Sequence, residues 1–199
     1  MVELDNKHLE NHKDMKEYKI NNKIYRLNLF DRITNHDQAY LVGYILGDGS
    51  YRQPTYKRKP RMAVSSTDLY IIDHFQKSFC PDNIAELKKP NSNKKRNIIG
   101  KLPFKLLGFS SKFTEGFNKF GVMSLKKTRT FHNIPKEWFH SMLLGLFDAD
   151  GNISWGFRKD RDRLWGNFVI THENLKLLEK IQRVFLEEYK IATSVTKKG

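Results

Sequence analysis

The 199-residue sequence contains one cysteine, Cys80, and no run of apolar residues long enough to span a membrane. A single cysteine excludes an internal disulfide and a cysteine-based zinc site, and it suits a reducing compartment. The first residues, MVELDNKHLENHKDMKEYK, are polar and mixed in charge, unlike a secretory leader. We therefore expect an intracellular protein that is neither secreted nor embedded in a membrane.

Acidic residues are also scarce, with 22 Asp and Glu against 36 Lys and Arg, which gives a formal net charge of +14. This excess predicts a polyanionic partner, either nucleic acid or an acidic membrane surface. Aromatic residues make up 13% of the chain, too large a share for a disordered basic tail. The length is sufficient for one larger folded domain or two small ones.

A ten-residue pattern occurs twice, as LVGYILGDGS at 41–50 and as LLGLFDADGN at 143–152. Each copy is largely apolar, has a small residue at its third and seventh positions, and carries Asp-Gly near its end. In each copy the two small residues are four apart and share one helix face. The sequence therefore predicts two helices that pack with their backbones nearly in contact.

Such a helix pair would bring Asp48 and Asp150 to adjoining C-terminal ends, where the helix dipoles already place negative charge. The two carboxylates would raise each other's pKa unless a cation lay between them, and a divalent cation with oxygen ligands fits. Alternatively, Asp-Gly is an ordinary helix stop. The paired site is favoured because the following segments also repeat: residues 61–75 and 167–181 each predict a short strand and an amphipathic helix.

Motif, spacing and flanking pattern together resemble the LAGLIDADG homing endonucleases, in the form with two motifs in one polypeptide. The resemblance covers the chain from about Tyr25 onward, and the second copy, LLGLFDADG, follows the family pattern almost letter by letter. The first copy, LVGYILGDG, has Leu46 where the family has an acidic residue. The resemblance implies an α+β fold of two pseudo-symmetric αββαββα repeats, with the motif helices at the interface and saddle-shaped antiparallel sheets. It implies an N-terminal arm at 1–36, a first repeat at 37–137 and a second repeat at 138–199.

The implied function is site-specific cleavage of double-stranded DNA by phosphodiester hydrolysis that depends on Mg²⁺ or another divalent cation such as Mn²⁺. The resemblance assigns Asp48 and Asp150 to catalysis and to the metal, which the backbone carbonyls of Gly47 and Ala149 would help to hold. It also assigns a catalytic role to Lys127, because Lys127-Thr128 matches a Lys-Ser/Thr pair of the family and Lys126 is only its neighbour. An exposed loop lysine is the alternative. Asp148 is expected to serve in capping or packing.

Basic and aromatic segments follow both motifs and predict contacts to DNA, with Arg and Lys binding phosphates and guanine edges. A solvated charged surface is the alternative interpretation. The predicted DNA-binding residues are Ser50, Tyr51, Arg52, Gln53, Tyr56, Lys57, Arg58, Arg61, Lys88, Lys94, Lys95, Arg96, Lys101, Lys105, Ser154, Trp155, Arg158, Lys159, Arg161 and Arg163.

The remaining patterns predict the order of elements around the motifs. Residues 1 to about 20 lack a pattern and are expected to form a frayed arm, and residues 34–37 offer capping side chains for the first motif helix. In the first half, the other predicted elements are a strand or extended lead-in at 24–30, a hairpin in 50–65, a helix ending at Phe79, strands at 84–89 and 104–110, and a helix at 111–120 closed by Gly121. In the second half, they are a hairpin in 153–165, a strand around Phe168 and a helix from Glu173 to about Glu188.

The second repeat is expected to end at a third strand, because Ile191-Ala-Thr aligns with Ile84-Ala-Glu. It then lacks about 50 residues that the first repeat has, and its third strand would have an unpaired edge. The chain could be a fragment, a second polypeptide could complete it, or the gene could be decaying. A nuclease-inactive DNA-binding remnant and a maturase that binds intron RNA therefore stay open as alternatives. The seven His residues are scattered singly, which disfavours a zinc-based or His-based nuclease site.

Overall fold

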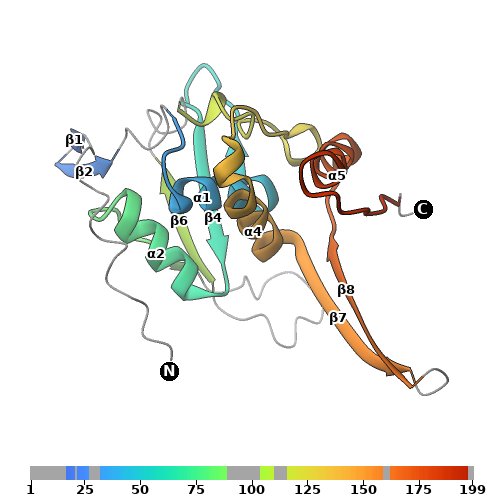
Figure 1. The fold of residues 1–199 in the computed structure, drawn as a ribbon. Helices are drawn as coiled ribbons and strands as arrows, with labels where there is room; N and C mark the ends of the chain where they lie inside the picture. Colours follow the sequence, from blue (N-terminus) through green and yellow to red (C-terminus); the bar gives the residue numbers. More distant parts are fainter. Residues whose placement is uncertain are drawn as a thin grey trace.

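The computed structural model describes residues 17–20, 22–26, 32–88, 104–109, 116–158 and 162–196. Two helices, α1 (His36–Asp48) and α4 (Phe139–Asp150), lie side by side at its centre (Figure 1). Helix α1 begins where the sequence predicts, because the side chain of Asn35 accepts a hydrogen bond from the Gln38 backbone N–H. Nearly all of α1 is buried, as expected for a helix that is apolar on every side.

The first repeat forms one antiparallel sheet with the strand order β3-β4-β6-β5. Helix α2 covers one face of this sheet and contributes Ile72, Phe75 and Phe79 to the core. The predicted order of helix, two strands, helix and two strands is confirmed. The elements are β3 (Ser50–Arg52), β4 (Arg61–Ser66), α2 (Leu69–Phe79), β5 (Glu86–Lys88) and β6 (Phe104–Phe109).

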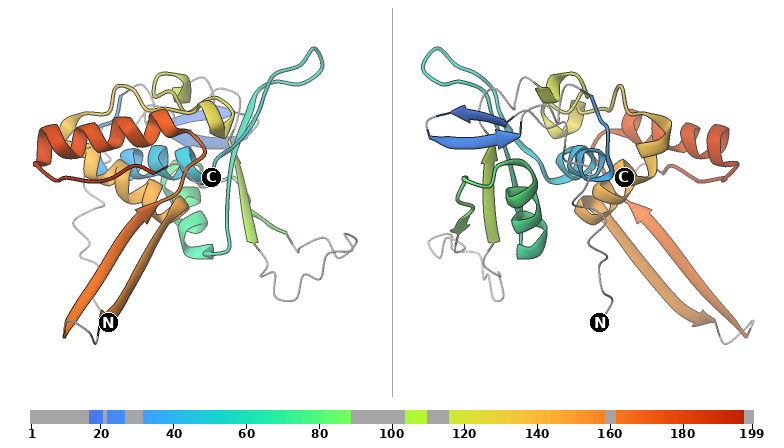
Figure 2. Two further views of the ribbon diagram at one scale, coloured as in Figure 1. Left: turned by 90° about the vertical axis from the view of Figure 1, so that its right-hand side faces the viewer. Right: turned by 60° about the vertical axis from the view of Figure 1, so that its left-hand side comes forward.

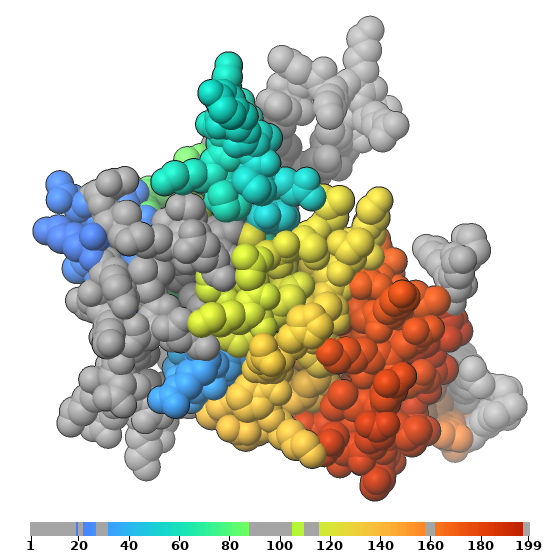
Figure 3. Space-filling view, turned by 90° about the horizontal axis from the view of Figure 1, so that it is seen from above, coloured from blue at the N-terminus to red at the C-terminus, as the bar shows by residue number. Residues whose placement is uncertain are grey.

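The second repeat places β7 (Gly151–Arg158) and β8 (Arg163–Ile170) in one long antiparallel ribbon, followed by α5 (Leu175–Tyr189). The hairpin in 153–165 and the strand around Phe168, which the sequence suggested as separate features, are parts of this single ribbon. Figure 2 shows the ribbon extending from the helix pair on the side opposite to the loop between β3 and β4. Residues 116–138 lie between the first repeat and α5 when the molecule is seen from above (Figure 3).

The N-terminal part differs from the prediction of an unpatterned arm up to about residue 20. Strands β1 (Glu17–Ile20) and β2 (Lys23–Arg26) form a short hairpin whose turn includes Asn22 at φ 62°. The backbone N–H of Ile24 donates to Asp82 at 2.7 Å, so the hairpin is attached to the first repeat. This long-range contact gives no periodic signal in the sequence.

The predicted third strand of the second repeat is not formed. Residues 190–196 have no strand structure, and the Gln182 side chain donates to the Thr193 carbonyl oxygen at 2.6 Å. An extended segment becomes a strand only where a neighbour supplies backbone partners, and the described residues supply none here. The physical reason for the correction is therefore the missing neighbour rather than the local sequence.

Other predicted segments fall partly outside the described residues. The helix at 111–120 is helical at 116–118, and Gly121 follows with a positive φ of 78°. The basic loop at 90–97 lies outside the described residues. Among the helices that are described, none has both the length and the apolar character needed to cross a membrane.

Candidate active site

The two motif helices approach so closely that side chains are excluded at their crossing. A Cβ atom on Gly43 would overlap the carbonyl oxygen of Met142, and a Cβ atom on Gly145 would overlap the carbonyl oxygen of Tyr40. Gly43 and Gly145 hold the same place in the two motif copies, as do Tyr40 and Met142. The contact is therefore pseudo-twofold, with a glycine of each helix against the backbone of the other.

The same packing continues to the C-terminal ends of the helices. A Cβ atom on Gly47 would lie 2.5 Å from the Cβ of Ala149 and 3.2 Å from Oδ2 of Asp150. The Asp150 carboxylate therefore lies beside the backbone of the residue that precedes Asp48. The structure places both acidic residues at the same end of the helix pair.

The environments of the two carboxylates differ. The pKa of Asp48 is raised, chiefly by desolvation and then by the negative charge of Asp150, while Lys126 and Arg129 act in the opposite direction. The Asp150 side chain is only 12% exposed, and its Oδ1 accepts a hydrogen bond from Lys126 Nζ at 2.8 Å. Its Oδ2 is buried and has no hydrogen-bond partner in the described part of the chain. An orphaned carboxylate oxygen of this kind is a position where a cation could bind.

The ammonium group that contacts Asp150 belongs to Lys126. The resemblance assigns the catalytic role to Lys127, and that role stays a prediction. Both residues lie in a 3₁₀ turn, η3 (Lys126–Thr128), in which successive side chains point about 120° apart. Lys126 reaches Asp150, and Lys127 is exposed. A sequence pattern identifies the basic turn but does not decide which of two adjacent lysines faces the aspartates.

Arg129 lies beneath the two carboxylates and was not identified from the sequence. Its side chain is 2% exposed, and its Nη1 donates to the carbonyl oxygens of Ile45 at 2.8 Å and Leu46 at 3.5 Å. Burial lowers the pKa of Arg129 to about 10, although Asp150 and Asp48 oppose this shift. Arg129 thus supplies positive charge to the carbonyls of the last turn of α1, where the helix dipole is negative. In the sequence it looks like any other arginine of a basic loop.

His172, from the second repeat, contacts the same helix end. Its Nε2 lies 3.1 Å from the Leu46 carbonyl oxygen, and its Nδ1 accepts from the Asn174 backbone N–H at 3.0 Å. These two partners require the neutral tautomer with hydrogen on Nε2, and burial lowers the pKa of His172. The Asn174 side chain also donates to the Arg129 carbonyl oxygen. Loops from both repeats therefore hold the end of α1 together.

The acidic residue at the sixth position of the second motif has a structural partner. The hydroxyl of Tyr40 donates to Oδ2 of Asp148 at 2.6 Å, across the helix pair. The pseudo-symmetric counterparts are Met142 and Leu46, and both are fully buried. A polar pair in one half thus corresponds to an apolar pair in the other. This explains why the first motif can carry Leu46 in place of an acid.

Comparison with known proteins agrees with this geometry. Residues 137–199 match the family model described as a LAGLIDADG-like domain. The chain also has a fold similar to that of a solved structure, the homing endonuclease I-WcaI bound to its DNA recognition sequence, with a TM-score of 0.53 and 14% identity over 84% of this chain and 73% of that chain.

Two further solved structures are similar at lower scores. The LAGLIDADG meganuclease I-AabMI bound to uncleaved DNA has a TM-score of 0.47 and 15% identity, over 83% of this chain and 76% of that chain. The LAGLIDADG homing endonuclease I-GzeII in complex with a DNA target has a TM-score of 0.45 and 10% identity, over 78% and 72%. A search of curated proteins found no match.

The strands that follow the two motif helices show which predicted DNA-binding residues share a face. In the first sheet, Tyr51 opposes Met62 and packs against the core, whereas Arg61 lies over Gly108 on the other face. Lys105 pairs with Asp73 of α2 at 2.6 Å. Because side chains alternate along a strand, Tyr51 and Lys105 therefore point to the helix-covered side of the sheet, opposite to Arg61. Their DNA-binding role stays a prediction. The exposed predicted residues here are Ser50, Arg52, Gln53, Tyr56, Lys57, Arg58 and Arg61.

The second ribbon shows the same alternation. Ile153 opposes Phe168 and Trp155 opposes Gly166, so Trp155 shares the apolar face of the ribbon rather than the face of Ser154 and Arg163. Trp155 is 78% exposed, and its DNA-binding role stays a prediction. Lys88 and Arg158 are strand residues whose side chains are not described. The predicted residues outside the described part of the chain are Lys94, Lys95, Arg96, Lys101, Lys159 and Arg161.

Proposed function

We propose that this chain is a site-specific homing endonuclease that hydrolyses phosphodiester bonds of double-stranded DNA with Mg²⁺ or another divalent cation such as Mn²⁺. The observation that carries the proposal is the buried Oδ2 of Asp150, which has no hydrogen-bond partner among the described residues and lies beside the helix end that bears Asp48. The DNA complex of I-WcaI, which has the same fold, supports duplex DNA as the ligand. The proposed location is inside the cell, with the host DNA.

The residues present fit a hard divalent cation. Among the described residues, no three His, Cys, Asp or Glu side chains form a metal-binding group, so two carboxylates would be the charged ligands. Mg²⁺ commonly binds through one or two carboxylates and keeps several waters. Asp48 and Asp150 would hold the cation, with the carbonyls of Gly47 and Ala149 as further oxygen ligands. When bound, such a cation acts as a Lewis acid and lowers the pKa of its water.

The protein side chains around the dyad have separate roles in this proposal. Lys126 places an ammonium group against Asp150 and would stabilise negative charge that develops on the attacked phosphate. Arg129 and His172 fix the backbone that precedes Asp48 and so orient its carboxylate. The exposed basic residues of the ribbons would bind phosphates, and base contacts from the same faces would select the site.

Cleavage of a supercoiled plasmid library with randomised inserts, in the presence of Mg²⁺, tests the proposal for whichever target sequence the protein recognises. We expect the wild type to linearise a subset of the library and Asp48→Asn and Asp150→Asn to lose at least a hundredfold in rate. Asp148→Asn is the matched control, because Asp148 bonds Tyr40 and should retain cleavage. Calorimetric titration with Mn²⁺ gives an independent readout. Unchanged Mn²⁺ affinity in both the Asp48 and Asp150 variants would contradict the metal site.

The alternatives make different predictions in the same assays. A nuclease-inactive DNA-binding protein would bind duplex DNA in proportion to its charge but leave every plasmid intact at any Mg²⁺ concentration. A maturase would bind intron RNA in preference to duplex DNA at equal salt. Completion of the second repeat by a second polypeptide also stays a proposal.

A further inference from the structure

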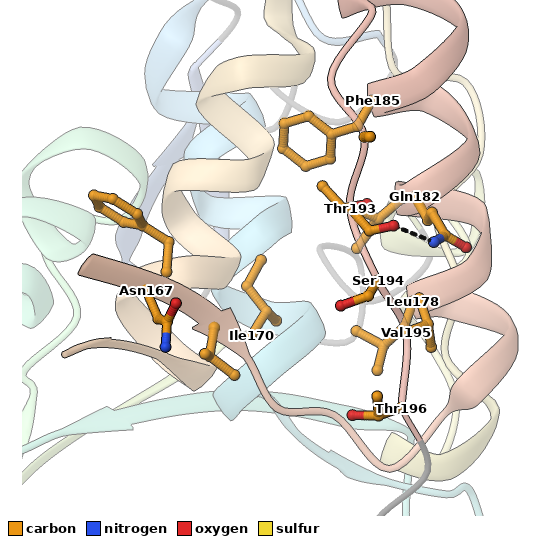
Figure 4. Close-up of a pocket in the computed structure, with 13 residues that line it drawn as sticks. Asn167, Ile170, Leu178, Gln182, Phe185, Thr193, Ser194, Val195 and Thr196 are labelled. Atoms are coloured by element: carbon orange, nitrogen blue, oxygen red, sulfur yellow. Dashed lines mark hydrogen bonds between the residues drawn. The ribbon is translucent and has the colours of Figure 1, made fainter. Parts of the chain in front are cut away.

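The ribbon formed by β7 and β8 carries a tryptophan, Trp165, on the face that is turned away from the helices. The other face belongs to the core side. There Phe168 lies next to Phe147 of α4, with ring centroids 6.3 Å apart, and Ile170 lines one cavity with Leu178 of α5 (Figure 4). Because side chains alternate along a strand, Trp165 points to the face opposite to Phe168 and Ile170.

Trp165 is held in place by the glycine that faces it across the ribbon. Trp165 and Gly156 are Cα partners, and a Cβ atom on Gly156 would lie only 2.8 Å from the indole Nε1 and 3.1 Å from Cζ2. The indole therefore lies across the backbone of Gly156, in the space that any other side chain would fill. The residue is nevertheless 36% exposed. One side of the ring is thus fixed against the ribbon, and the rest is accessible to a ligand.

The first repeat has a similar arrangement on its outer face. The guanidinium group of Arg61 in β4 lies where a Cβ atom on Gly108 of β6 would be. In the aligned repeats Arg61 corresponds to Asn167, which is two residues after Trp165 and therefore on the same face of β8. Each repeat thus places a long side chain over a glycine on the face that is turned away from its own helix, α2 or α5.

The neighbours of Trp165 on this face are mainly polar. Asn167 and Ser154 form the next pair of Cα partners toward the helices, and Arg163, which is exposed, lies two residues away in the other direction. A two-stranded ribbon fits the major groove of DNA, where amide and guanidinium groups bond base edges and apolar side chains contact the C5-methyl group of thymine. An indole that is already fixed also loses little conformational freedom on binding.

We propose that Trp165 is a specificity-determining residue that contacts the C5-methyl group of a thymine in the major groove of the target DNA. The inference rests on the proposed function, because it assigns a base contact within the proposed DNA interface. An uncharged ring is unsuited to binding phosphate, and the thymine methyl is the apolar group that the groove offers it. Trp155, which the sequence pattern favoured for DNA contact, lies on the opposite face and provides the comparison.

Replacement of thymine by deoxyuridine tests this contact, because only the methyl group is removed. Duplexes that bind the full chain are first selected from a random library in chelator, so that recovery of a target does not depend on cleavage. We expect deoxyuridine to lower wild-type affinity by about threefold to fivefold at one or two adjacent positions, the size expected for one buried methyl group. Trp165→Ala should bind the thymine duplex more weakly and should not distinguish it from the deoxyuridine duplex.

Trp155→Ala is the matched control, since it removes the same side chain from the opposite face of the ribbon and should keep the thymine preference. Unchanged thymine preference in Trp165→Ala would overturn the proposal, as would an equal loss of preference in Trp155→Ala. A wild type that binds every deoxyuridine duplex as tightly as the thymine duplex would also overturn it.

A photochemical cross-link tests the contact without any substitution in the protein. In 5-iododeoxyuridine an iodine atom replaces the thymine methyl group, and irradiation joins this position to an aromatic side chain in contact with it. We expect peptide mapping to place the cross-link on Trp165, at the same thymine that the deoxyuridine scan identifies. A cross-link on another residue, or none at that thymine, would overturn the proposal.

The selection step separates this inference from the proposed function. A library that yields no preferred sequence would contradict site-specific DNA binding as a whole, and the role of Trp165 would fail with it. A preferred sequence whose thymines are recognised equally well by the wild type and Trp165→Ala would overturn the role of Trp165 alone.

Discussion

At the scale of single residues, two carboxylates share one end of a helix pair with the negative poles of both helices. Three side chains offset this accumulation of negative charge. Lys126 neutralises Asp150, Arg129 donates to the last carbonyls of α1, and His172 donates to one of them from the other repeat. The site is therefore held together by contacts that cross from one repeat to the other.

The raised pKa of Asp48 predicts that its ionised carboxylate destabilises the metal-free protein. Below the unfolded-state pKa both states hold the proton and there is no penalty; the penalty grows as pH rises through the folded-state pKa and is complete above it. We expect Asp48→Asn to raise the Tm by a few degrees at pH 7 in chelator, with the gain shrinking toward about pH 4. Scanning calorimetry at both pH values measures this, and a lower Tm for the variant at pH 7 would contradict it.

Cleavage rates should distinguish the roles of the two adjacent lysines, Lys126 and Lys127. Lys126→Met removes the ammonium beside Asp150 and should slow cleavage by about a hundredfold or more, as for other lost electrostatic contacts at a reacting centre. Lys127→Met is the matched control and should change single-turnover rates by less than about threefold, because exposed charges away from the reaction contribute little. A larger loss at Lys127 would show that the family pattern, and not the contact to Asp150, marks the functional lysine.

At the scale of elements, the helix pair determines where the acids are. Gly43 and Gly145 have no side chain at the crossing, so each helix backbone contacts the other. The distance between the helix ends therefore depends on glycine at these two positions. The pseudo-symmetry is close enough for a hydrogen bond between Tyr40 and Asp148 to be replaced in the other half by an apolar pair, Met142 and Leu46. A polar pair and an apolar pair thus occupy equivalent positions of the same helix–helix interface.

Adding a methyl group at the crossing should affect both stability and metal binding. We expect Gly43→Ala to lower the free energy of unfolding by about 2–3 kcal/mol, in the range of overpacked cores, and to weaken Mn²⁺ binding because the helix ends move apart. Gly166→Ala is the control, since a Cβ there meets only the Ser154 carbonyl oxygen at 3.8 Å. Denaturant unfolding and Mn²⁺ titration measure the two effects. A neutral Gly43→Ala would rule out the close approach.

At the scale of the whole molecule, the positive charge should govern DNA binding. A protein that neutralises about 6–10 phosphates loses about 10³–10⁵ in affinity between 50 and 200 mM salt. We expect a loss in this range for this chain of net charge +14 on duplex DNA. Anisotropy titrations with labelled duplex at several salt concentrations measure the slope. An affinity that is independent of salt would contradict a phosphate-dominated interface.

The two repeats share one sequence pattern, but their described sheets differ in the number of strands. In the first repeat β6 covers the apolar face of β4, whereas among the described residues β8 pairs only with β7. Both repeats nevertheless contribute to one core, since Leu41, Leu146 and Ile181 belong to the same cluster. The helix pair is thus common to the two repeats, while the sheets are separate.

The sequence by itself determined the helix pair, its glycine contacts, the shared end of Asp48 and Asp150, and the order of strands in the first repeat. These features follow from local periodicity and from duplication, which a linear pattern records. Only the tertiary structure decided that Lys126 contacts Asp150, that Arg129 and His172 hold the end of α1, and that Tyr51 and Lys105 lie on the helix-covered face of the first sheet. Such contacts depend on the rotation of a turn, the face of a strand and partners far away in the chain. The segment after α5 is not a strand for the same reason, because pairing requires a neighbour that no local sequence can supply.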